Sequence, residues 1–304
     1  MNHISDLLDS VTDPKIRDSL ARIHQGIQTA DKAVREQAPN KPKSAEIIQL
    51  PLWPEPARGV PNSALRGALF AAIQGKDRQA LKRTLLSVQK GMEVRFTGWQ
   101  LDQSDLDVWE QALHLARHHP LGTRCEFTAH GFLKALGRST GKTNHEWLKD
   151  VFARLAGAVV EITHDRKTYF GPLIEGGARD EDSGRYVVEI NPKIKALYTA
   201  GWTACDWQQR QQLRGKPLAL WLHGFYASHA DPYPMKIETL YGLSGSRNKQ
   251  PADFKRKLRT ALTDLQATGV IRGFEISQDG LVSVYRNPSR SQQKHLRKAK
   301  ARKK

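Results

Sequence analysis

The stretch from Met235 to Arg286 constrains the fold more than any other part of the sequence. Apolar residues at helical spacing begin it, and a Ser-Gly-Ser break at 244–246 follows. A second predicted helix has one apolar face, because its apolar residues recur at spacings of four, four and three: Phe254, Leu258, Leu262 and Leu265. Gly269 ends this helix, and the Asp279-Gly280 pair between two β-branched runs predicts a hairpin turn. The order helix, turn, helix and hairpin predicts a winged helix-turn-helix.

Such a fold places its second helix in the DNA major groove and lets the hairpin wing reach phosphate or the minor groove. Lysines on a helix more often form a solvated face than a site, but these cations lie on the second helix and its approach. Candidate DNA contacts in this stretch are Arg247, Asn248, Lys249, Lys255, Arg256, Arg259 and Arg272. Arg and Asn side chains there can contact guanine and adenine through paired hydrogen bonds.

The same pattern occurs upstream. Cys125–Ile162 and Pro234–Ile276 both run short apolar helix, Gly/Ser turn with basic residues, long striped helix, Gly and strand, offset by roughly 110 positions. We therefore expect an α+β fold with two tandem winged-helix domains. Candidate DNA contacts in the first copy are Arg138, Lys142, Thr143, Asn144, His145 and Lys149, with Arg166 and Lys167 at a hairpin turn.

Other segments predict the surroundings of the two copies. Helices are expected through Leu65–Ile73 and Leu81–Val88, and from Asp102 to Ala116 with Leu106, Trp109 and Leu113 on one face. A further helix is expected over Cys205–Ser228, kinked at Pro217.

Domain limits follow from composition. Six prolines between Ala38 and Asn62 predict a linker, and a run of basic residues after Arg286 predicts a disordered tail. We expect an N-terminal helical extension and Pro-rich linker at 1–61, a first winged helix at 62–200, a second at 201–286 and a basic tail at 287–304. A four-three apolar spacing at 16–34 is compatible with self-association and equally with packing on the body.

Net charge limits the classes of partner. The formal charge of +17 favours a polyanion, nucleic acid before membrane surface. Cys125 and Cys205 fit no metal spacing, which favours structural thiols in a reducing compartment. Neither a signal peptide nor a membrane span is predicted, so we expect a cytoplasmic protein.

Catalytic and cofactor sites are not predicted. Residues 137–143 resemble a phosphate-binding loop, but three residues separate the glycines where four are needed, and a helix precedes them where a strand is needed. His114, His118 and His119 have helical metal-ligand spacing without a nearby acid or Cys, so a solvated or DNA-facing trio is expected. We expect no enzyme, no metal and no cofactor. A nucleotide-dependent enzyme using 137–143 is the less favoured alternative.

Four segments carry a resemblance to a known family. Leu50-Pro-Leu-Trp-Pro-Glu-Pro-Ala-Arg-Gly59, Leu121-Gly-Thr-Arg-Cys-Glu-Phe127, Trp202-Thr-Ala-Cys-Asp-Trp207 and Leu218-Ala-Leu-Trp-Leu-His-Gly-Phe-Tyr226 resemble the TrfA family, the replication initiators of IncP plasmids. The resemblance implies a monomer that binds iteron repeats at a plasmid origin. It also implies that the C-terminal winged helix is the main base-contacting domain and that the N-terminal one lies on adjacent backbone.

The resemblance further implies a dimer that forms through the N-terminal winged helix, does not initiate and so limits copy number. Implied partners are origin duplex DNA, the host initiator DnaA, the replicative helicase and the sliding clamp, with single-stranded AT-rich DNA as a further candidate. A tandem winged-helix transcription regulator is the alternative within the same fold.

One segment bears on the clamp. Gln103, Leu106 and Trp109 are similar to the short Gln/Leu/aromatic peptides that bind sliding clamps, although Trp replaces the usual Phe. The alternative, which we favour, is that Leu106 and Trp109 belong to the buried stripe of a helix.

Overall fold

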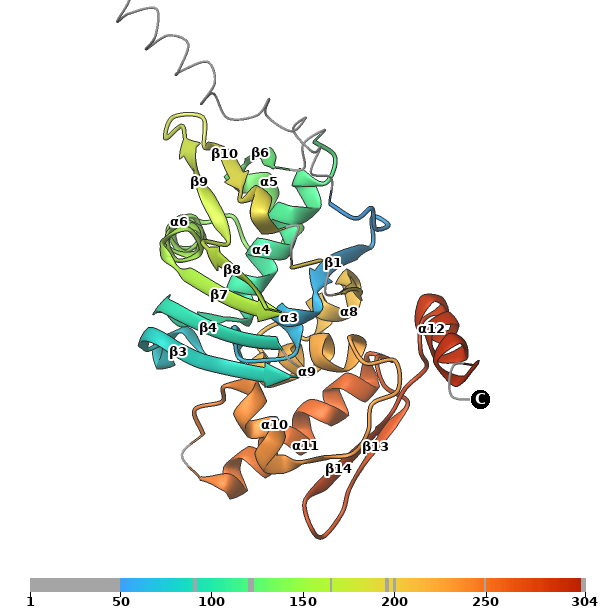
Figure 1. The fold of residues 1–304 in the computed structure, drawn as a ribbon. Helices are drawn as coiled ribbons and strands as arrows, with labels where there is room; N and C mark the ends of the chain where they lie inside the picture. The colour runs from blue at the N-terminus through green and yellow to red at the C-terminus, as the bar shows by residue number, and fades with distance from the viewer. Residues whose placement is uncertain are drawn as a thin grey trace, which may run out of the picture. The chain divides into compact units, whose positions relative to one another are not determined.

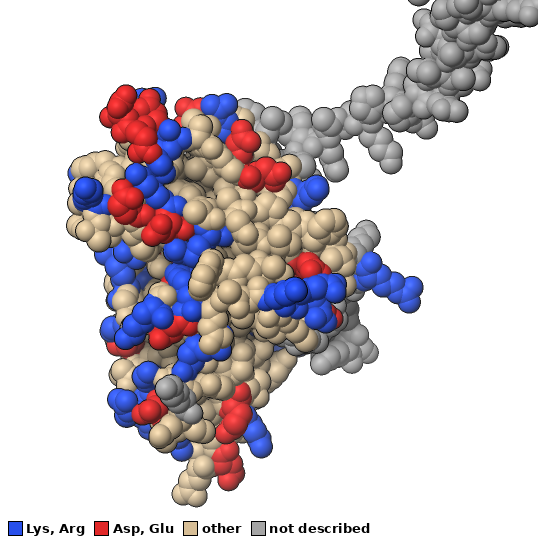
Figure 2. Space-filling model, turned by 90° about the vertical axis from the view of Figure 1, so that its left-hand side faces the viewer, with Lys and Arg blue, Asp and Glu red and all other residues tan. Residues whose placement is uncertain are grey.

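The structure is a computed structural model that describes residues 50–89, 92–119, 123–164, 166–194, 197–198, 201–248 and 250–301. The predicted helix in residues 1–36 and the candidate Lys249 lie outside these ranges. The described chain is a mixed α+β fold (Figure 1), and its surface carries Lys and Arg among Asp and Glu (Figure 2). Within these ranges, every helix is too short or too polar to cross a membrane.

The first helix-turn-helix lies between strands of one sheet. Strand β6 (Arg124–Thr128) leads into α5 (Ala129–Ala135) and α6 (Lys142–Gly157). Strands β9 (Ile174–Arg179) and β10 (Arg185–Ile190) form an antiparallel hairpin, and β6 pairs with β10, giving the order β6-β10-β9. We call these elements, together with the rest of residues 50–205 that share the first hydrophobic core with them, the first module.

The second helix-turn-helix repeats that topology. Strand β12 (Met235–Lys236) leads into α10 (Ile237–Ser244) and α11 (Pro251–Ala267). Strands β13 (Gly273–Ile276) and β14 (Leu281–Tyr285) form the wing, and the order is β12-β14-β13. These elements, α9 (Pro217–Ala227) and the segment from Leu213 that leads into α9 are the second module. The two modules therefore share helix order, as the sequence repeat predicts, and they also share a strand order that the repeat does not predict.

Local signals explain why the second module folds as predicted. The apolar stripe of α11 is buried at Phe254, Leu258, Leu262 and Leu265. Gly280 has φ of +74°, a conformation that side chains disfavour, so the Asp279-Gly280 pair forms the predicted turn of the wing.

The hairpin after α6 is not the wing of the first module. Strands β7 (Val159–His164) and β8 (Lys167–Gly171) join β3 (Ala80–Gln89) and β4 (Met92–Trp99) in an antiparallel sheet of order β3-β4-β7-β8. Arg166, at the turn between β7 and β8, thus lies at the end of a different sheet. The β9–β10 hairpin holds the topological place of the wing.

The helix predicted over 81–88 is wrong, because strand β3 occupies this segment. Two register shifts interrupt its pairing with β4. The first shift puts Leu81 and Leu85 on opposite faces of the strand, so the four-residue spacing that resembles a helical stripe in the sequence does not mark one face. Leu81 packs against the core, whereas Leu85 lies on the other face and is 45% exposed.

Two more predicted helices are interrupted. The segment 65–73 contains only the end of α3 (Asn62–Leu65) and strand β2 (Phe70–Ala71), which pairs in parallel with β5 (Leu101–Asp102). Residues 202–227 form β11 (Trp202–Asp206), α8 (Trp207–Gln212) and α9 in place of one helix. Short 3-10 turns lie elsewhere in the chain, at 75–77 and 192–194. Pro217 begins α9 instead of kinking a longer helix, because the first turn needs no N–H from it.

The Pro-rich linker ends earlier than residue 61. Leu50 and Trp53 are each 4% exposed, and β1 (Ala57–Pro61) pairs antiparallel with β11. Trp53 Nε1 donates to His114 Nδ1 at 3.1 Å, and the other nitrogen of the imidazole, His114 Nε2, lies 2.9 Å from Glu55 Oε1. His114 is therefore buried and neither solvated nor DNA-facing, and burial lowers its pKa to about 4.

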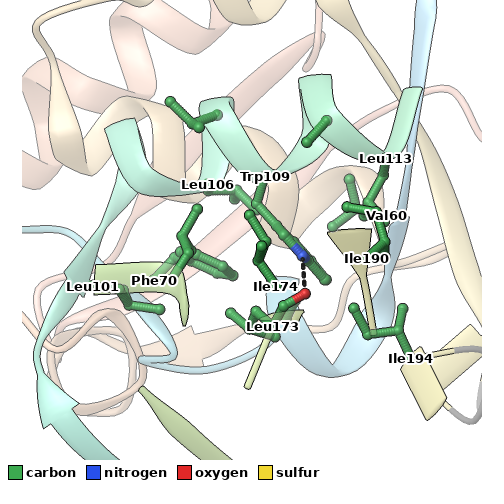
Figure 3. Close-up of a cluster of buried hydrophobic side chains, with 14 of the residues drawn as sticks. Val60, Phe70, Leu101, Leu106, Trp109, Leu113, Leu173, Ile174, Ile190 and Ile194 are labelled. Carbon is green, nitrogen blue, oxygen red and sulfur yellow. Dashed lines mark hydrogen bonds between the residues drawn. The ribbon is translucent and has the colours of Figure 1, made fainter. Parts of the chain in front are cut away.

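Helix α4 (Gln103–Ala116) runs through the first core. Asp102 caps it in a reciprocal capping box with Asp105. Leu106 and Trp109 are at most 1% exposed, and Trp109 Nε1 donates to Leu173 O at 3.3 Å (Figure 3). Gln103 is also buried. Burial of all three side chains supports the core alternative over a clamp-binding peptide.

The basic tail is helical and not disordered over most of its length. Helix α12 (Arg290–Ala301) follows β14. Ser289 N–H donates to Gln292 Oε1 at 2.9 Å, while Gln292 N–H donates to Ser289 Oγ at 3.3 Å. This Ser-x-x-Gln capping box is a helix start that the charge count conceals. Gln292 Nε2 also donates to Ala227 O at 2.8 Å and so fixes the first turn of α12 to the end of α9.

A buried arginine joins the two modules. The first core extends to Cys205, and the second begins at Leu213. Between them, Arg210 of α8 is 1% exposed and donates through Nε to Asp107 Oδ1 at 2.6 Å and through Nη2 to Gln103 O at 3.1 Å. Its Nη1 donates to Leu220 O of α9 at 3.3 Å. Burial lowers the pKa of Arg210, but the attraction of the Asp107 and Glu110 carboxylates is larger, so the pKa is raised.

Replacing the central core residue tests the burial of α4. We expect Trp109→Ala to lower the free energy of unfolding by about 3–5 kcal/mol, because it removes a large side chain from a closed core. Trp99→Ala is the matched control, since Trp99 is 59% exposed, and should change it by less than about 0.5 kcal/mol. Urea unfolding followed by circular dichroism measures both. Equal effects would contradict the core assignment.

Glu110 gives stability a pH dependence. Burial raises its pKa to about 7, and neither carboxylate oxygen has a hydrogen-bond partner among the described residues. Folding favours the neutral carboxyl, because the pKa rises from 4.5 in the unfolded chain to about 7 in the fold. The resulting stabilisation is complete below about pH 4.5 and is lost as the pH rises through 7. The free energy of unfolding, measured in urea, should be lower at pH 8 than at pH 5 by up to about 3 kcal/mol through this group.

Glu110→Gln should reduce this decrease, because the glutamine cannot ionise. Glu126→Gln is the control, since the Glu126 side chain is 58% exposed. A decrease that is the same in Glu110→Gln as in the unaltered protein would contradict the assignment.

Candidate nucleic-acid interface

The exposed face of α11 is basic. Lys255, Arg256 and Arg259 are exposed outside the buried stripe of the helix, with Arg256 on the side opposite it. The guanidinium of Arg256 lies 3.6 Å from Asp253, and its side chain remains 73% exposed. These cations can therefore meet the backbone or base edges of DNA without repacking the core.

The turn before α11 is held by its own side chains. Asn248 Nδ2 donates to Ser246 Oγ at 2.6 Å, and Asn248 Oδ1 accepts from Lys257 Nζ at 2.5 Å. Tyr241 Oη donates to Asn248 O at 3.0 Å. Because both ends of the amide are occupied, Asn248 stabilises the turn in this state and is a poor candidate for base contact.

Lys257 was missed by sequence reasoning. It lies off the face formed by Lys255 and Arg259, and its contact with Asn248 gives it a role in shaping the turn. No local pattern distinguishes it from its basic neighbours in the sequence.

Two further candidates flank α11. Arg247 is exposed, yet its Nη2 donates to Gln100 Oε1 at 3.3 Å. Arg272 is exposed at the start of the wing, where its N–H donates to Tyr285 O at 2.7 Å and its carbonyl accepts from Gln266. The structure thus gathers Arg272 and the basic face of α11 in one module.

The first module presents a weaker basic helix. Lys142 and Thr143 are exposed at the N-terminus of α6, where the first N–H groups lack helical partners. Asn144 Nδ2 donates to Ser139 O and Oγ at 2.9 and 2.7 Å. The Arg138 guanidinium lies 3.6 Å above the Trp147 ring, and burial lowers the pKa of this arginine. Arg138 therefore orders the turn.

Acidic residues of the β9–β10 hairpin approach α6. Lys149 Nζ lies 3.0 Å from Glu146 and 3.3 Å from Glu181 at the hairpin tip. A hollow of about 320 Å³ lies beside this contact, and His145 and Lys142 line it with Asp180. The side chains of Glu146 and Glu181 thus neutralise part of the charge that the sequence predicts for this helix. Figure 2 shows the mixture on one face, with Lys and Arg in a band and acidic side chains between them.

The remaining candidates lie apart from this surface. Arg166 is exposed with φ of +63° at the β7–β8 turn, and the side chain of Lys167 is not described. Helix α5 precedes the loop 137–143, as predicted, so the strand that a phosphate-binding loop requires is absent there. Among the described residues, no group of three or more His, Cys, Asp or Glu could hold a metal ion.

Comparison with known proteins agrees with this architecture. Residues 19–286 match the TrfA protein family. The plasmid replication initiator protein TrfA of Escherichia coli is 25% identical over 248 residues, which cover 79% of this chain and 64% of that protein. The chain therefore spans less than two thirds of the length of this relative.

Solved structures give likeness of fold alone. Domains 2 and 3 of RctB align with a TM-score of 0.51 at 13% identity, over 75% of this chain and 99% of theirs. The Pi initiator protein in complex with iteron DNA aligns with a TM-score of 0.42 at 11% identity, over 66% and 99%. The second likeness is too weak to support an argument.

The family match, in contrast, is extensive enough to assign this chain to a family. It runs through both helix-turn-helix units and both wings and covers most of the sequence, including the segments that suggested the resemblance. This chain belongs to the TrfA protein family.

Proposed function

We propose that this chain is a plasmid replication initiator that binds tandem repeats, or iterons, at an origin of replication. The observation that carries the proposal is the exposed basic face of α11, the second helix of a helix-turn-helix, in a chain of the TrfA family. Proteins with this fold insert that helix into the major groove, where Arg side chains can contact guanine through paired hydrogen bonds. Arg256 and Arg259 are the candidates for those contacts.

The two modules divide the contacts unequally. Residues 201–286 provide the base-contacting domain, because α11 carries cations that point away from the core. Residues 62–200 provide a domain that touches adjacent DNA backbone. The ion pairs of Lys149 with Glu146 and Glu181 support the weaker role, since carboxylates beside α6 repel phosphate.

Initiation further requires strained DNA and host proteins. In this proposal, monomers bound in arrays bend the duplex, help to open adjacent AT-rich DNA and recruit DnaA and the replicative helicase. A dimer formed through the first module limits copy number. Membership of the TrfA family supports these steps. Gln103, Leu106 and Trp109 do not bind the sliding clamp in this proposal, because their side chains are buried.

A tandem winged-helix transcription regulator remains the competing function, and the arrangement of binding sites distinguishes the two. Selection of bound duplexes from a pool with a randomised central segment yields the preferred site, which is then located in the replicon that encodes the chain. Non-palindromic sites in direct repeat beside AT-rich DNA support initiation. A single inverted repeat at a promoter would favour the regulator. Binding should not require ATP.

Removal of one exposed arginine tests the base-contacting helix. We expect Arg256→Ala to weaken binding to the selected duplex by about 5- to 100-fold, the loss of one paired base contact. Fluorescence anisotropy measures the affinity, and thermal stability should not change, because the side chain is 73% exposed.

Arg83→Ala is the matched control for Arg256→Ala. Arg83 is 69% exposed and, like Arg256, is paired with one carboxylate, but it lies on β3, outside both helix-turn-helix units. Equal loss of affinity in the two variants would remove Arg256 from the interface.

A further inference from the structure

The end of α5 is bonded by side chains from outside its own module. The last carbonyls of a helix lack partners within the helix. Ala135 O accepts from Trp207 Nε1 at 3.2 Å and from Gln211 Nε2 at 2.8 Å, both on α8. Helix α8 connects the modules, so the connection itself stabilises the end of the first helix of the helix-turn-helix.

Arg214 extends this contact into the turn. It follows Leu213, which is 1% exposed in the second core. Its Nη2 donates to Leu136 O at 2.9 Å, and its Nη1 donates to Gly137 O. Gly137 has φ of +65° and reverses the chain toward α6. Arg138 comes next and stacks on Trp147 of α6, so the Arg214 contact is one residue from a side chain packed on that helix.

The turn of the second module is held in the same way by the first. Ser244 O, at the end of α10, accepts from the N–H of Ala72 at 2.7 Å. Gly245 lies against the segment that precedes Ala72. A Cβ added at Gly245 would be 2.9 Å from the Cβ of Ala68. Arg247 Nη2 then donates to Gln100 Oε1, beside Leu101 of the first core.

We propose that each module positions the DNA-contacting helix of the other by holding the turn that precedes it. Arg214 positions α6, and Gln100 positions α11. The contacts are reciprocal, so α6 and α11 move as one body, and a change at the joint between modules reaches both helices through their turns. The statement about DNA rests on the proposed function, whereas the statement about the turns does not.

The proposal predicts effects that cross from one module to the other. A site that needs both helices should lose affinity when α6 is no longer positioned, while a site contacted by α11 alone should not. Footprinting with Arg256→Ala identifies the base pairs that α11 protects, and a duplex truncated to them serves as the half-site. The selected duplex serves as the full site.

Arg214→Ala should weaken binding to the full site by about tenfold and leave binding to the half-site unchanged. Lys216→Ala is the matched control. Lys216 is a nearby cation, 48% exposed, whose Nζ lies 2.7 Å from Asp264 on α11, so its contact stays within the second module. Gln100→Ala, in the first module, should weaken binding to the half-site of the second. Equal losses on both duplexes in Arg214→Ala would overturn the positioning role.

Hydrogen exchange tests the turns without DNA. In the full chain, Arg214→Ala should accelerate amide exchange at 137–143, and Gln100→Ala should accelerate it at 244–248, while Lys216→Ala changes neither segment. Unaltered exchange in the first two variants would overturn the inference even if DNA binding were lost. If the unaltered chain selects no duplex, the proposed function fails, and the exchange rates still decide whether the modules hold each other's turns.

Discussion

The buried guanidinium of Arg210 is the interaction on which the arrangement of the two modules depends. It donates to α4 on one side and to α9 on the other, and so bonds the central helix of the first core to the leading helix of the second. A buried charge is tolerated only where its hydrogen bonds are satisfied, and this requirement fixes the position of α8. Helix α8 in turn brings Trp207, Gln211 and Arg214 to the end of α5. The geometry of the turn before α6 therefore traces back to a salt bridge between α8 and the first core.

The sequence was sufficient where local signals determine structure. The stripe at Phe254, Leu258 and Leu262, and the turn at Gly280, predicted the second module because helix faces and tight turns depend on neighbours in sequence. Prediction failed where distant pairing decides. The bulges in β3 exist only against β4, and β1 becomes a strand only because β11 lies beside it. The prediction of a disordered tail was wrong for another reason. It rested on the run of basic residues and did not use the capping signal at Ser289, which is present in the sequence.

The candidate interface was predictable in part for similar reasons. A buried stripe identifies the opposite face of α11, so its exposed cations follow from the sequence. The acidic approach to α6 does not, because Lys149 and Glu181 meet only through the fold of the β9–β10 hairpin. Likewise, Oδ1 of Asn248 is available to a base only if Lys257 leaves it unoccupied, and Nδ2 of the same side chain is engaged by Ser246. A list of polar residues near a turn cannot separate those that contact DNA from those that build the turn.

The pairing of β1 with β11 has a consequence for synthesis on the ribosome. Pro61 and Trp202 are opposite one another, so the first strand leaves the exit tunnel long before its partner exists. At translation rates of ~5–20 residues per second, the delay is on the order of ten seconds. During that time the buried side chains of Trp53 and Val60 lack part of their cover. The nascent chain therefore carries apolar side chains without their full cover, and the first module is complete only when the connection to the second has been made.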